Sequence, residues 1–199
     1  MTGNEERITG LLLAAGGGRR LGGRPKALLG HRGRPLVEHA VEVLRAAGCD
    51  HVHVVLGAAA AVVRERADLV GCVLVDNPDW EQGMGSSLRA GLDSLTATGA
   101  RAALVSLVDQ PGIGRQAVAR VLAAYRDEES LASAAYEGMR GHPVLLGSAH
   151  WAGIARTATG DRGARAYLSA HDDAITLVEC GDVAQAYDID TPADLSHLE

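Results

Sequence analysis

The chain alternates short, continuously apolar runs with segments whose apolar residues recur at helical spacing. A strand that is apolar throughout must be covered on both faces, which is typical of a parallel sheet between helices. The alternation therefore predicts an α/β fold with a doubly wound, mostly parallel sheet and helices on both faces. The expected strands are residues 7–14, 51–56, 72–75, 101–108, 131–136, 143–146 and 174–178, and the first expected helices are residues 35–47, 59–68, 85–95 and 114–126.

Length and organisation favour one unit. With 199 residues, no linker and no internal repeat, the whole chain 1–199 is expected to form a single domain. In doubly wound sheets, ligands bind beyond the carboxyl ends of the strands, where the strand order reverses. The segments that follow the first, third and fourth expected strands are therefore the ones in which functional residues should be sought.

The loop after the first expected strand has an unusual charge. Between Arg7 and Val37 the sequence holds seven cations and no carboxylate, although the net charge of the chain is −6, so the remaining residues sum to −13. A cationic loop on an acidic body suits a small polyanion such as a nucleoside triphosphate. A nucleic acid would require a broad basic surface, so we expect no nucleic-acid partner.

The cysteines and the apolar segments indicate the cellular compartment of the protein. Cys49, Cys72 and Cys180 are far apart and lack the C-x-x-C spacing, which predicts free thiols in a reducing compartment. Acidic residues precede the first apolar run, and no cleavage-site pattern follows it. No apolar stretch approaches the roughly 20 residues of a membrane helix. We therefore expect a cytoplasmic protein that does not bind membranes.

Two common phosphate-binding motifs do not fit the glycine-rich loop. Counted from Gly16, the third glycine of the dinucleotide motif G-x-G-x-x-G is replaced by Leu21. The acid that should follow about 20 residues later is also missing. The Walker A motif fails because Gly-Arg follows Gly22, where the motif needs Lys-Ser or Lys-Thr. An NAD(P)- or flavin-dependent oxidoreductase on a related fold is thus disfavoured, and it stays open as an alternative.

The pattern that does fit is LAAG-x-G-x-R-L-G-x-x-x-K over residues 13–26. Glycines let backbone N–H groups come close to phosphate oxygens. Arg20 offers two parallel hydrogen bonds to a phosphate, whereas Lys26 offers a point charge on a flexible side chain.

This segment resembles the nucleotide-binding loop of the MobA-like nucleotidyltransferases, which handle the molybdenum cofactor. The combination of LAAG and Arg-Pro-Lys is similar to the cytidylyltransferase branch of that family, whereas the guanylyltransferase branch more often shows LAGG and an acid before the lysine. The resemblance implies CTP as the nucleotide. The residues it implies for nucleotide binding are Ala14, Ala15, Gly16 and Gly18, and those it implies for catalysis on the triphosphate are Arg20 and Lys26.

The segment after the third expected strand, NPDWEQGMGSSLRAGL, has two interpretations. Serines in the first turn of a helix serve well as N-caps, which is a purely structural role. In the family that the chain resembles, this segment binds the base, which implies nucleotide-binding roles for Gly83 and Ser87. The two interpretations do not exclude each other.

Carboxylates follow the fourth expected strand and recur near the C-terminus. A buried carboxylate is costly without a partner, so Asp109 is expected to meet a cation or the solvent. Mg²⁺ prefers one or two carboxylates together with substrate phosphates. The resemblance implies that Asp109 binds the metal and that Asp190 is the second ligand, with Asp188 as the alternative. Asp109 could also simply begin a turn, and the C-terminal acids could simply cap the helix that begins near Thr191.

Two further segments match the family. His142, in Gly-His-Pro, matches the acceptor side of cytidylyltransferases, although a lone histidine is more often structural. The segment GDRGAR at residues 160–165 also matches, but only a capping role for Asp161 can be suggested from its sequence.

Six segments that match in order imply a nucleotidyltransferase. The implied reaction moves a cytidylyl group from CTP to a phosphorylated acceptor, the molybdenum cofactor, with Mg²⁺ as cofactor and release of pyrophosphate. A molybdoenzyme or its insertion chaperone is the implied protein partner. The alternatives that stay open are GTP as the nucleotide, a sugar phosphate as the acceptor, the oxidoreductase named above, and a non-catalytic nucleotide-binding module.

Overall fold

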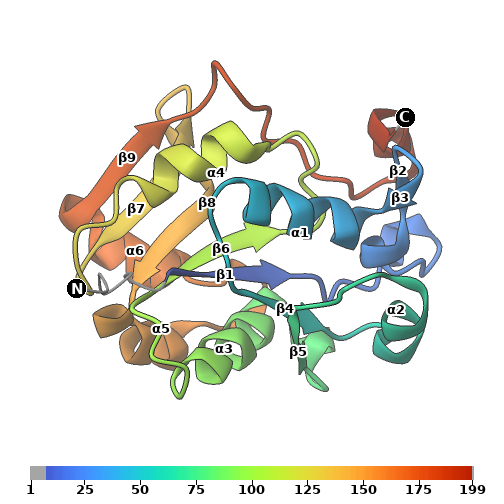
Figure 1. The fold of residues 1–199 in the computed structure, drawn as a ribbon, viewed down its shortest axis with the longest axis horizontal. Coiled ribbons are helices and arrows are strands. Elements are labelled where there is room, and N and C mark those ends of the chain that lie inside the picture. Colours follow the sequence, from blue (N-terminus) through green and yellow to red (C-terminus); the bar gives the residue numbers. More distant parts are fainter. Residues whose placement is uncertain (1–7, 199) are drawn as a thin grey trace.

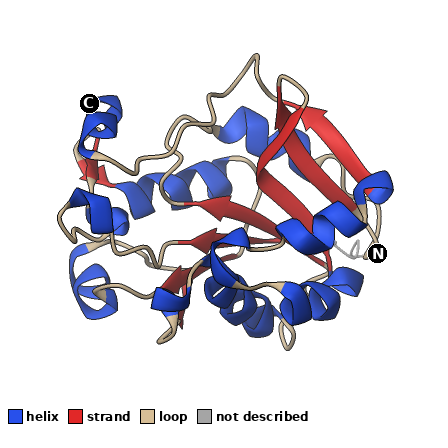
Figure 2. Ribbon diagram, turned by 180° about the vertical axis from the view of Figure 1, so that it is seen from behind, coloured by secondary structure: helices blue, strands red, loops and turns tan. Residues whose placement is uncertain are grey.

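The computed structural model describes residues 8–198, in which helices cover both faces of a seven-stranded sheet (Figures 1 and 2). The expected strand at residues 7–14 is confirmed from residue 8 onward, and Arg7 lies outside the described residues. In spatial order the strands are β5 (Val73–Asp76), β4 (Val52–Leu56), β1 (Ile8–Leu13), β6 (Ala102–Leu107), β8 (Met139–Gly147), β7 (Leu131–Tyr136) and β9 (Ile175–Glu179).

The sheet is doubly wound and mostly parallel, as the sequence predicts. Strands β5, β4, β1 and β6 run parallel to one another, and β9 is parallel to β7. Strand β8 is antiparallel to β6 and to β7. The chain moves outward from β1 to β4 and β5 and then returns to place β6 on the other side of β1. The strand order therefore reverses between β1 and β6.

The alternation of side chains along β1 explains why both faces are covered. Leu12 points into one hydrophobic layer, whereas Leu11 and Leu13 point into the other, because successive residues of a strand face opposite sides. Helices α1 (Leu36–Ala46), α2 (Ala60–Arg66) and α4 (Arg115–Leu122) contribute to the first layer. Helices α3 (Met84–Leu95), α5 (Trp151–Thr157) and α6 (Arg165–Ala170) contribute to the second.

The close packing of α3 depends on a glycine. A Cβ atom on Gly91 would lie 2.6 Å from Cδ1 of Leu11, so a larger residue there would push the helix away from β1. Helix α3 begins at the carboxyl edge of the sheet, and its position therefore fixes the loop in front of it.

The structure adds short elements that the sequence does not predict. They are the hairpin of β2 (Gly30–His31) and β3 (Arg34–Pro35), and the 3₁₀ helices η1 (Arg19–Leu21), η2 (Lys26–Leu28), η3 (Trp80–Gln82), η4 (Ser148–His150), η5 (Gly160–Arg162) and η6 (Asp172–Ala174). The helix expected near Thr191 is the 3₁₀ helix η7 (Pro192–Leu198). Both ribbon views place η7 beside the β2–β3 hairpin (Figures 1 and 2). The expected strand 143–146 is longer than predicted, because β8 pairs with β7 through a turn at Glu137 and Gly138.

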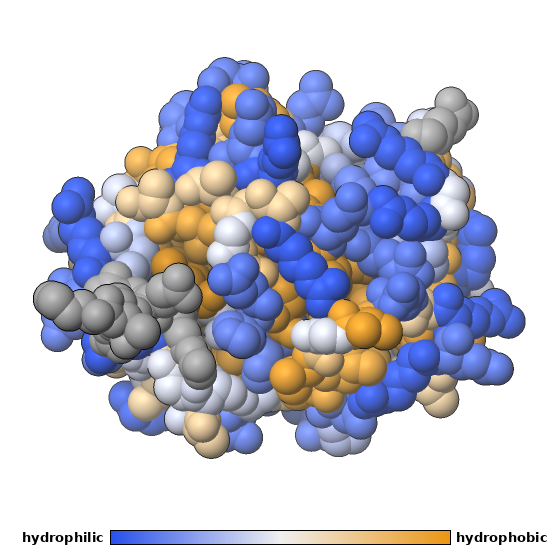
Figure 3. All heavy atoms as spheres, viewed as in Figure 1, coloured by the Kyte–Doolittle hydropathy of each residue, from blue (hydrophilic) through white to orange (hydrophobic). Residues whose placement is uncertain are grey.

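The surface view shows hydrophobic side chains toward the middle of one face, with hydrophilic side chains around them (Figure 3). Among the described residues, no helix is long and apolar enough to cross a membrane. The three cysteines are free thiols; Cys49 and Cys180 are buried, and Cys72 is half-buried.

Candidate nucleotide-binding and active site

The candidate site lies at the carboxyl edge of the sheet, where the strand order reverses. Three loops meet there, following β1, β5 and β6, and the chain returns to this edge just before η7. Backbone bonds hold the edge together: Val108 N donates to Leu13 O at 3.1 Å, and Ile189 N donates to Asp109 O at 2.8 Å. The ligand-binding edge predicted from the fold class is therefore the edge at which the predicted residues gather.

The glycine-rich loop is shaped by Gly18. This residue has φ of 60°, and a Cβ atom on it would lie 2.1 Å from the carbonyl oxygen of Arg24. Its own carbonyl accepts bonds from Leu21 N at 2.8 Å and Gly23 N at 3.0 Å. Only glycine fits here without moving the backbone.

The start of the same loop is fixed to the sheet. Ala14 and Ala15 are buried, whereas Gly16 is exposed. Ala14 N donates to Val55 O at 2.9 Å, and Ala58 N donates to Ala15 O at 3.0 Å. These bonds hold the loop against β4, so that Gly16 faces the solvent at the mouth of the site.

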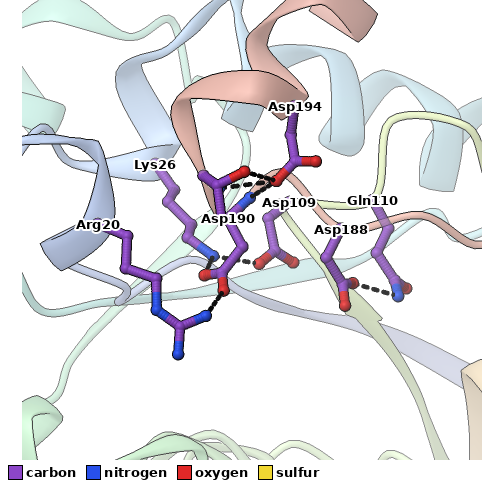
Figure 4. Close-up of polar contacts among 8 residues, drawn as sticks. Arg20, Lys26, Asp109, Gln110, Asp188, Asp190 and Asp194 are labelled. Carbon is purple, nitrogen blue, oxygen red and sulfur yellow. Dashed lines mark hydrogen bonds and ion pairs between the residues drawn. The ribbon is translucent and has the colours of Figure 1, made fainter.

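Four charged side chains form the phosphate-side cluster: Arg20, Lys26, Asp109 and Asp190 (Figure 4). Lys26 Nζ lies 2.6 Å from Asp109 Oδ2 and 3.1 Å from Asp190 Oδ1. Arg20 Nη1 lies 2.7 Å from Asp190 Oδ2. The Lys26 side chain is 13% exposed and that of Arg20 is 72% exposed, so the cluster extends from the protein interior to the solvent.

Burial and ion pairing compete in this cluster. For Asp109, burial raises the pKa above its usual value and outweighs the nearby Lys26 ammonium. For Lys26, burial alone would lower the pKa, but Asp109 and Asp190 together hold it above its usual value. The hydrogen bond from Lys26, helped by Arg20, lowers the pKa of Asp190. The charge on Asp109 therefore depends on a nearby cation.

The structure separates the two C-terminal acids that the sequence left as alternatives. Both carboxylates point the same way in Figure 4, but only Asp190 contacts Lys26. Asp188 instead accepts a bond from Gln110 Nε2 at 2.7 Å. Asp194 accepts bonds from the backbone N–H groups of Asp190 and Thr191, at 3.0 and 2.7 Å. The predicted helix start is thus confirmed, although the helix is 3₁₀, and it orients Asp190.

The phosphate-side cluster offers a small donor set for a cation. Within residues 8–198 there is no group of three or more His, Cys, Asp or Glu side chains arranged to hold a metal ion. Asp109 and Asp190 form a pair, since both lie against the same Lys26 ammonium. Mg²⁺ is usually held by one or two carboxylates, with phosphate oxygens and water completing its coordination. This pair fits such a shared site and would not suit a metal held by protein ligands alone.

The loop after β5 contains a neutral, buried network that the sequence did not reveal. Asn77 Nδ2 donates to Ser86 Oγ at 2.9 Å and to Ser87 Oγ at 3.0 Å. Asn77 Oδ1 accepts a bond from Asp79 N at 3.0 Å, and Ser86 Oγ donates within this loop. The capping interpretation of the serines is wrong, because Gly83 is the N-cap of α3 and no side chain caps it. A polar residue at the end of a strand, nine residues before a serine pair, was the signal for this network.

Trp80 joins this loop to the glycine-rich loop. A Cβ atom on Gly17 would lie 2.8 Å from the Trp80 ring, and one on Gly57 would lie 2.5 Å from Trp80 Cβ. The indole therefore fills the space between the loops after β1, β4 and β5. Gly83, with φ of 103°, ends the turn that begins at Trp80.

His142 lies on β8, on the side of the site occupied by Asp188. Burial lowers the pKa of His142 to about 4, although the nearby Asp188 carboxylate acts in the opposite direction. The Tyr136 hydroxyl donates to the His142 carbonyl at 2.7 Å. The imidazole is therefore neutral at physiological pH, when it can both donate and accept a hydrogen bond.

Comparison with known proteins gives a family match. The model of the MobA-like NTP transferase domain matches residues 10–175. The chain is 42% identical to the nicotine blue oxidoreductase of Paenarthrobacter nicotinovorans, over 96% of each chain. It is 34% identical to a probable molybdenum cofactor guanylyltransferase of Opitutus terrae, over 57% of this chain and 53% of that protein.

Solved structures share the fold over almost the whole chain. A homolog, from Mycobacterium sp. strain JC1, of the Mycobacterium tuberculosis protein Rv0371c is 30% identical with a TM-score of 0.81, over 97% of this chain and 95% of that chain. Rv0371c from M. tuberculosis, solved in complex with manganese, is 27% identical with a TM-score of 0.75, over 96% of this chain and 97% of that chain.

Proposed function

This chain belongs to the MobA-like NTP transferase family, a family of nucleotidyltransferases, and we propose that it transfers a cytidylyl group from CTP to the phosphate of the molybdenum cofactor. The observation that carries this proposal is the phosphate-side cluster at the reversal of strand order. Two cations next to two carboxylates suit a triphosphate bound together with a divalent cation.

The proposed reaction forms one bond and breaks one. An oxygen of the acceptor phosphate attacks the α-phosphorus of CTP, the bond between the α-phosphorus and the bridging oxygen breaks, and pyrophosphate leaves. A phosphate oxygen is already nucleophilic at neutral pH, so the protein has mainly to position the groups and stabilise charge.

Residues of the glycine-rich loop position the triphosphate and stabilise its charge. Gly16 and Gly18 place backbone N–H groups near the triphosphate, and Ala14 and Ala15 hold the loop in place. Lys26 stabilises the negative charge that develops on the α-phosphate, and Arg20, which is more exposed, binds the leaving pyrophosphate.

Asp109 and Asp190 would hold Mg²⁺, which when bound would neutralise phosphate charge. The manganese in the complex of Rv0371c, a protein of the same fold at 27% identity, supports a divalent cation in this chain too.

The substrates are proposed from the sequence pattern and the geometry together. CTP is favoured by Ala15 in LAAG and by Arg24-Pro25-Lys26, in which no acid precedes the lysine. The similarity of the chain to the guanylyltransferase named above supports GTP as the main alternative nucleotide. Gly83 and Ser87 belong to the loop that would hold the base, although the Ser87 hydroxyl is buried and already accepts a bond from Asn77. The neutral His142 would contact the acceptor.

The cellular setting follows from this role. A molybdoenzyme or its insertion chaperone would receive the product, and free cysteines suit the reducing cytoplasm. Residues 1–199 would act as one domain, with no nucleic-acid or membrane partner.

The test is a panel of four nucleoside triphosphates with Mg²⁺, scored for pyrophosphate release with and without molybdenum cofactor. We expect release that depends on both Mg²⁺ and the cofactor and that is fastest with CTP. GTP as the better substrate would overturn the CTP assignment alone. An Asp109→Asn enzyme with near-normal turnover would overturn the mechanism.

A second candidate is supported by the relative that shares 42% identity along almost the whole chain and is named an oxidoreductase. In that case, a reduced nicotinamide or flavin cofactor would transfer hydride to nicotine blue or a similar dye. The glycine-rich loop lacks the dinucleotide motif, which argues against it. Consumption of NADH or NADPH at 340 nm in the presence of such a dye, without pyrophosphate release from any triphosphate, would favour this candidate.

A further inference from the structure

The turn formed by residues 159–163 packs directly against the start of α3. A Cβ atom on Gly83 would lie 2.5 Å from Oδ1 of Asp161 and 2.7 Å from the Gly160 carbonyl oxygen. A Cβ atom on Gly85 would lie 2.7 Å from Thr159 N. The Arg89 guanidinium also donates to the Ala158 carbonyl, which ties the turn to α3. A segment about 80 residues away in sequence therefore borders the loop that would hold the base.

This border continues the line of contacts that starts at the glycine-rich loop. The Trp80 ring lies against Gly17, and Gly83 N donates to the Trp80 carbonyl at 3.1 Å. Gly83 in turn lies against Asp161. A nucleotide with its phosphates at residues 16–26 and its base along the turn from Trp80 to Gly83 would bring the edge of that base to the Asp161 carboxylate.

Asp161 has a free acceptor, whereas the buried side chains of the loop after β5 are engaged with their own loop. Asn77 Oδ1 accepts from Asp79 N, and the Ser86 and Ser87 hydroxyls accept from Asn77. The Asp161 side chain is exposed and has no hydrogen bond or ion pair within residues 8–198. The capping role suggested by the sequence is wrong, because neither η5 nor α6 has a side-chain cap.

We infer that Asp161 recognises the exocyclic amino group of the nucleobase, accepting a hydrogen bond from the 4-amino group of cytosine or the 2-amino group of guanine. This inference rests on the proposed function and adds a specificity-determining residue to it. Uracil carries a carbonyl oxygen where cytosine carries its amino group, so the carboxylate would repel it. Hypoxanthine lacks the 2-amino group of guanine. Either base would leave the Asp161 carboxylate without its partner.

The test measures binding of the magnesium complexes of CTP, UTP, GTP and ITP by titration calorimetry, with no acceptor present. We expect the wild-type protein to bind CTP over UTP, or GTP over ITP, by roughly tenfold, the size of one hydrogen bond to a charged group. Asp161→Asn should reduce that ratio to about twofold, because an amide can also turn its NH₂ group toward a carbonyl oxygen.

The matched control is Asp173→Asn, which makes the same chemical change on another 3₁₀ helix. Asp173 is exposed and lies two residues before the first residue of β9, the edge strand on the opposite side of the sheet from β5. It should leave all four affinities unchanged. Asp161→Ala, checked by circular dichroism for an intact fold, gives a second variant that should also lose the preference.

Two results would overturn the inference: a wild-type protein that binds amino and non-amino bases equally, or an Asp161→Asn protein that keeps the wild-type ratio. Its failure is distinguishable from failure of the proposed function. A protein that shows the amino-group preference but releases no pyrophosphate from any triphosphate contradicts the transferase alone. A protein that releases pyrophosphate while Asp161→Asn keeps the ratio contradicts only the role of Asp161.

Discussion

The two sides of the site are built from opposite kinds of polar group. The phosphate side has four charged side chains that pair with one another and extend to the solvent. The base side has the neutral groups of Asn77, Ser86 and Ser87, all buried and hydrogen-bonded within their own loop. The charged side chains can replace their ion pairs with contacts to a substrate. The neutral groups instead fix the shape of the base loop, so that recognition of the base depends on residues at the border of that loop.

The largest expected effect is on the charged side. Lys26→Ala should reduce nucleotidyl transfer by about 10³-fold, because a preorganised charge near the transferring phosphate is worth about 4 kcal/mol. It also leaves the carboxylate of Asp109 without its closest cation. Steady-state pyrophosphate release with Mg-CTP measures the loss.

The control for this prediction is a cation outside the site. Arg120 makes two hydrogen bonds to Asp182 on the surface, and Arg120→Ala should leave the transfer rate unchanged. If both variants lost activity equally, the contrast between the phosphate-side cluster and an ordinary surface ion pair would be wrong.

The next effect concerns the neutral His142 and depends on pH. Because the folded protein lowers the pKa of His142 from 6.5 to about 4, the unfolded chain takes up a proton more readily. The free energy of unfolding should therefore fall as the pH drops from about 6.5 to about 4 and should level off below that, with His142 contributing at most about 3 kcal/mol of the loss. His142→Gln should lack this contribution.

Urea unfolding at pH 7 and at pH 4.5 measures this difference. The gap in unfolding free energy between wild type and His142→Gln should shift in favour of the variant at the lower pH. Equal pH dependence in the two proteins would contradict a lowered pKa of His142 in the folded protein.

The neutral network should have a smaller effect, mainly on stability. Asn77→Ala removes the donor to two buried hydroxyls and the acceptor for Asp79 N, which should cost about 2 kcal/mol. The KM for the triphosphate should rise more than kcat falls, because the base loop loses its shape. Ser196→Ala is the control, since this exposed hydroxyl bonds only within η7 and should change stability by less than about 0.5 kcal/mol. A harmless Asn77→Ala would mean that the loop does not depend on the network.

The smallest expected effect distinguishes two costs of a side chain at Gly83, the strain of a positive φ and the clash with residues 160–161. Gly83 and Gly99 both have positive φ, of 103° and 75°. A Cβ atom on Gly99 would meet no atom within 4 Å, whereas one on Gly83 would meet Gly160 and Asp161. Gly83→Ala should therefore cost about 1–2 kcal/mol more than Gly99→Ala in thermal or urea unfolding. Equal costs would show that residues 160–161 can move away freely.

Much of the fold could be predicted because it depends on local patterns. A continuous apolar run such as that of β6 requires helices on both faces of the sheet. Apolar residues at helical spacing, as in α1, show which segments form these helices. Strand β8 was underpredicted because its first residues, Met139 and Arg140, are exposed and lack an apolar pattern. Their pairing with β7 makes them part of the strand, and pairing is not a local property.

The candidate site could be predicted only in part. The cations of the glycine-rich loop and the acids after β6 stand out in the sequence because charge and glycine are unusual at strand ends. Asn77 was missed because a single asparagine in a loop resembles any turn residue. The position of Asp161 against Gly83 could not be foreseen, since it depends on how the turn before α6 packs on α3.

The sequence by itself determined the alternation of strands and helices, the cationic loop and the family to which the chain belongs, because these depend on residue types at short spacing. Only the tertiary structure decided that Lys26 lies between two carboxylates, 83 and 164 residues away, and that Asp190 takes this place while Asp188 turns to Gln110. The physical reason is that the order of strands in the sheet, and not distance along the chain, determines which loops meet at its carboxyl edge.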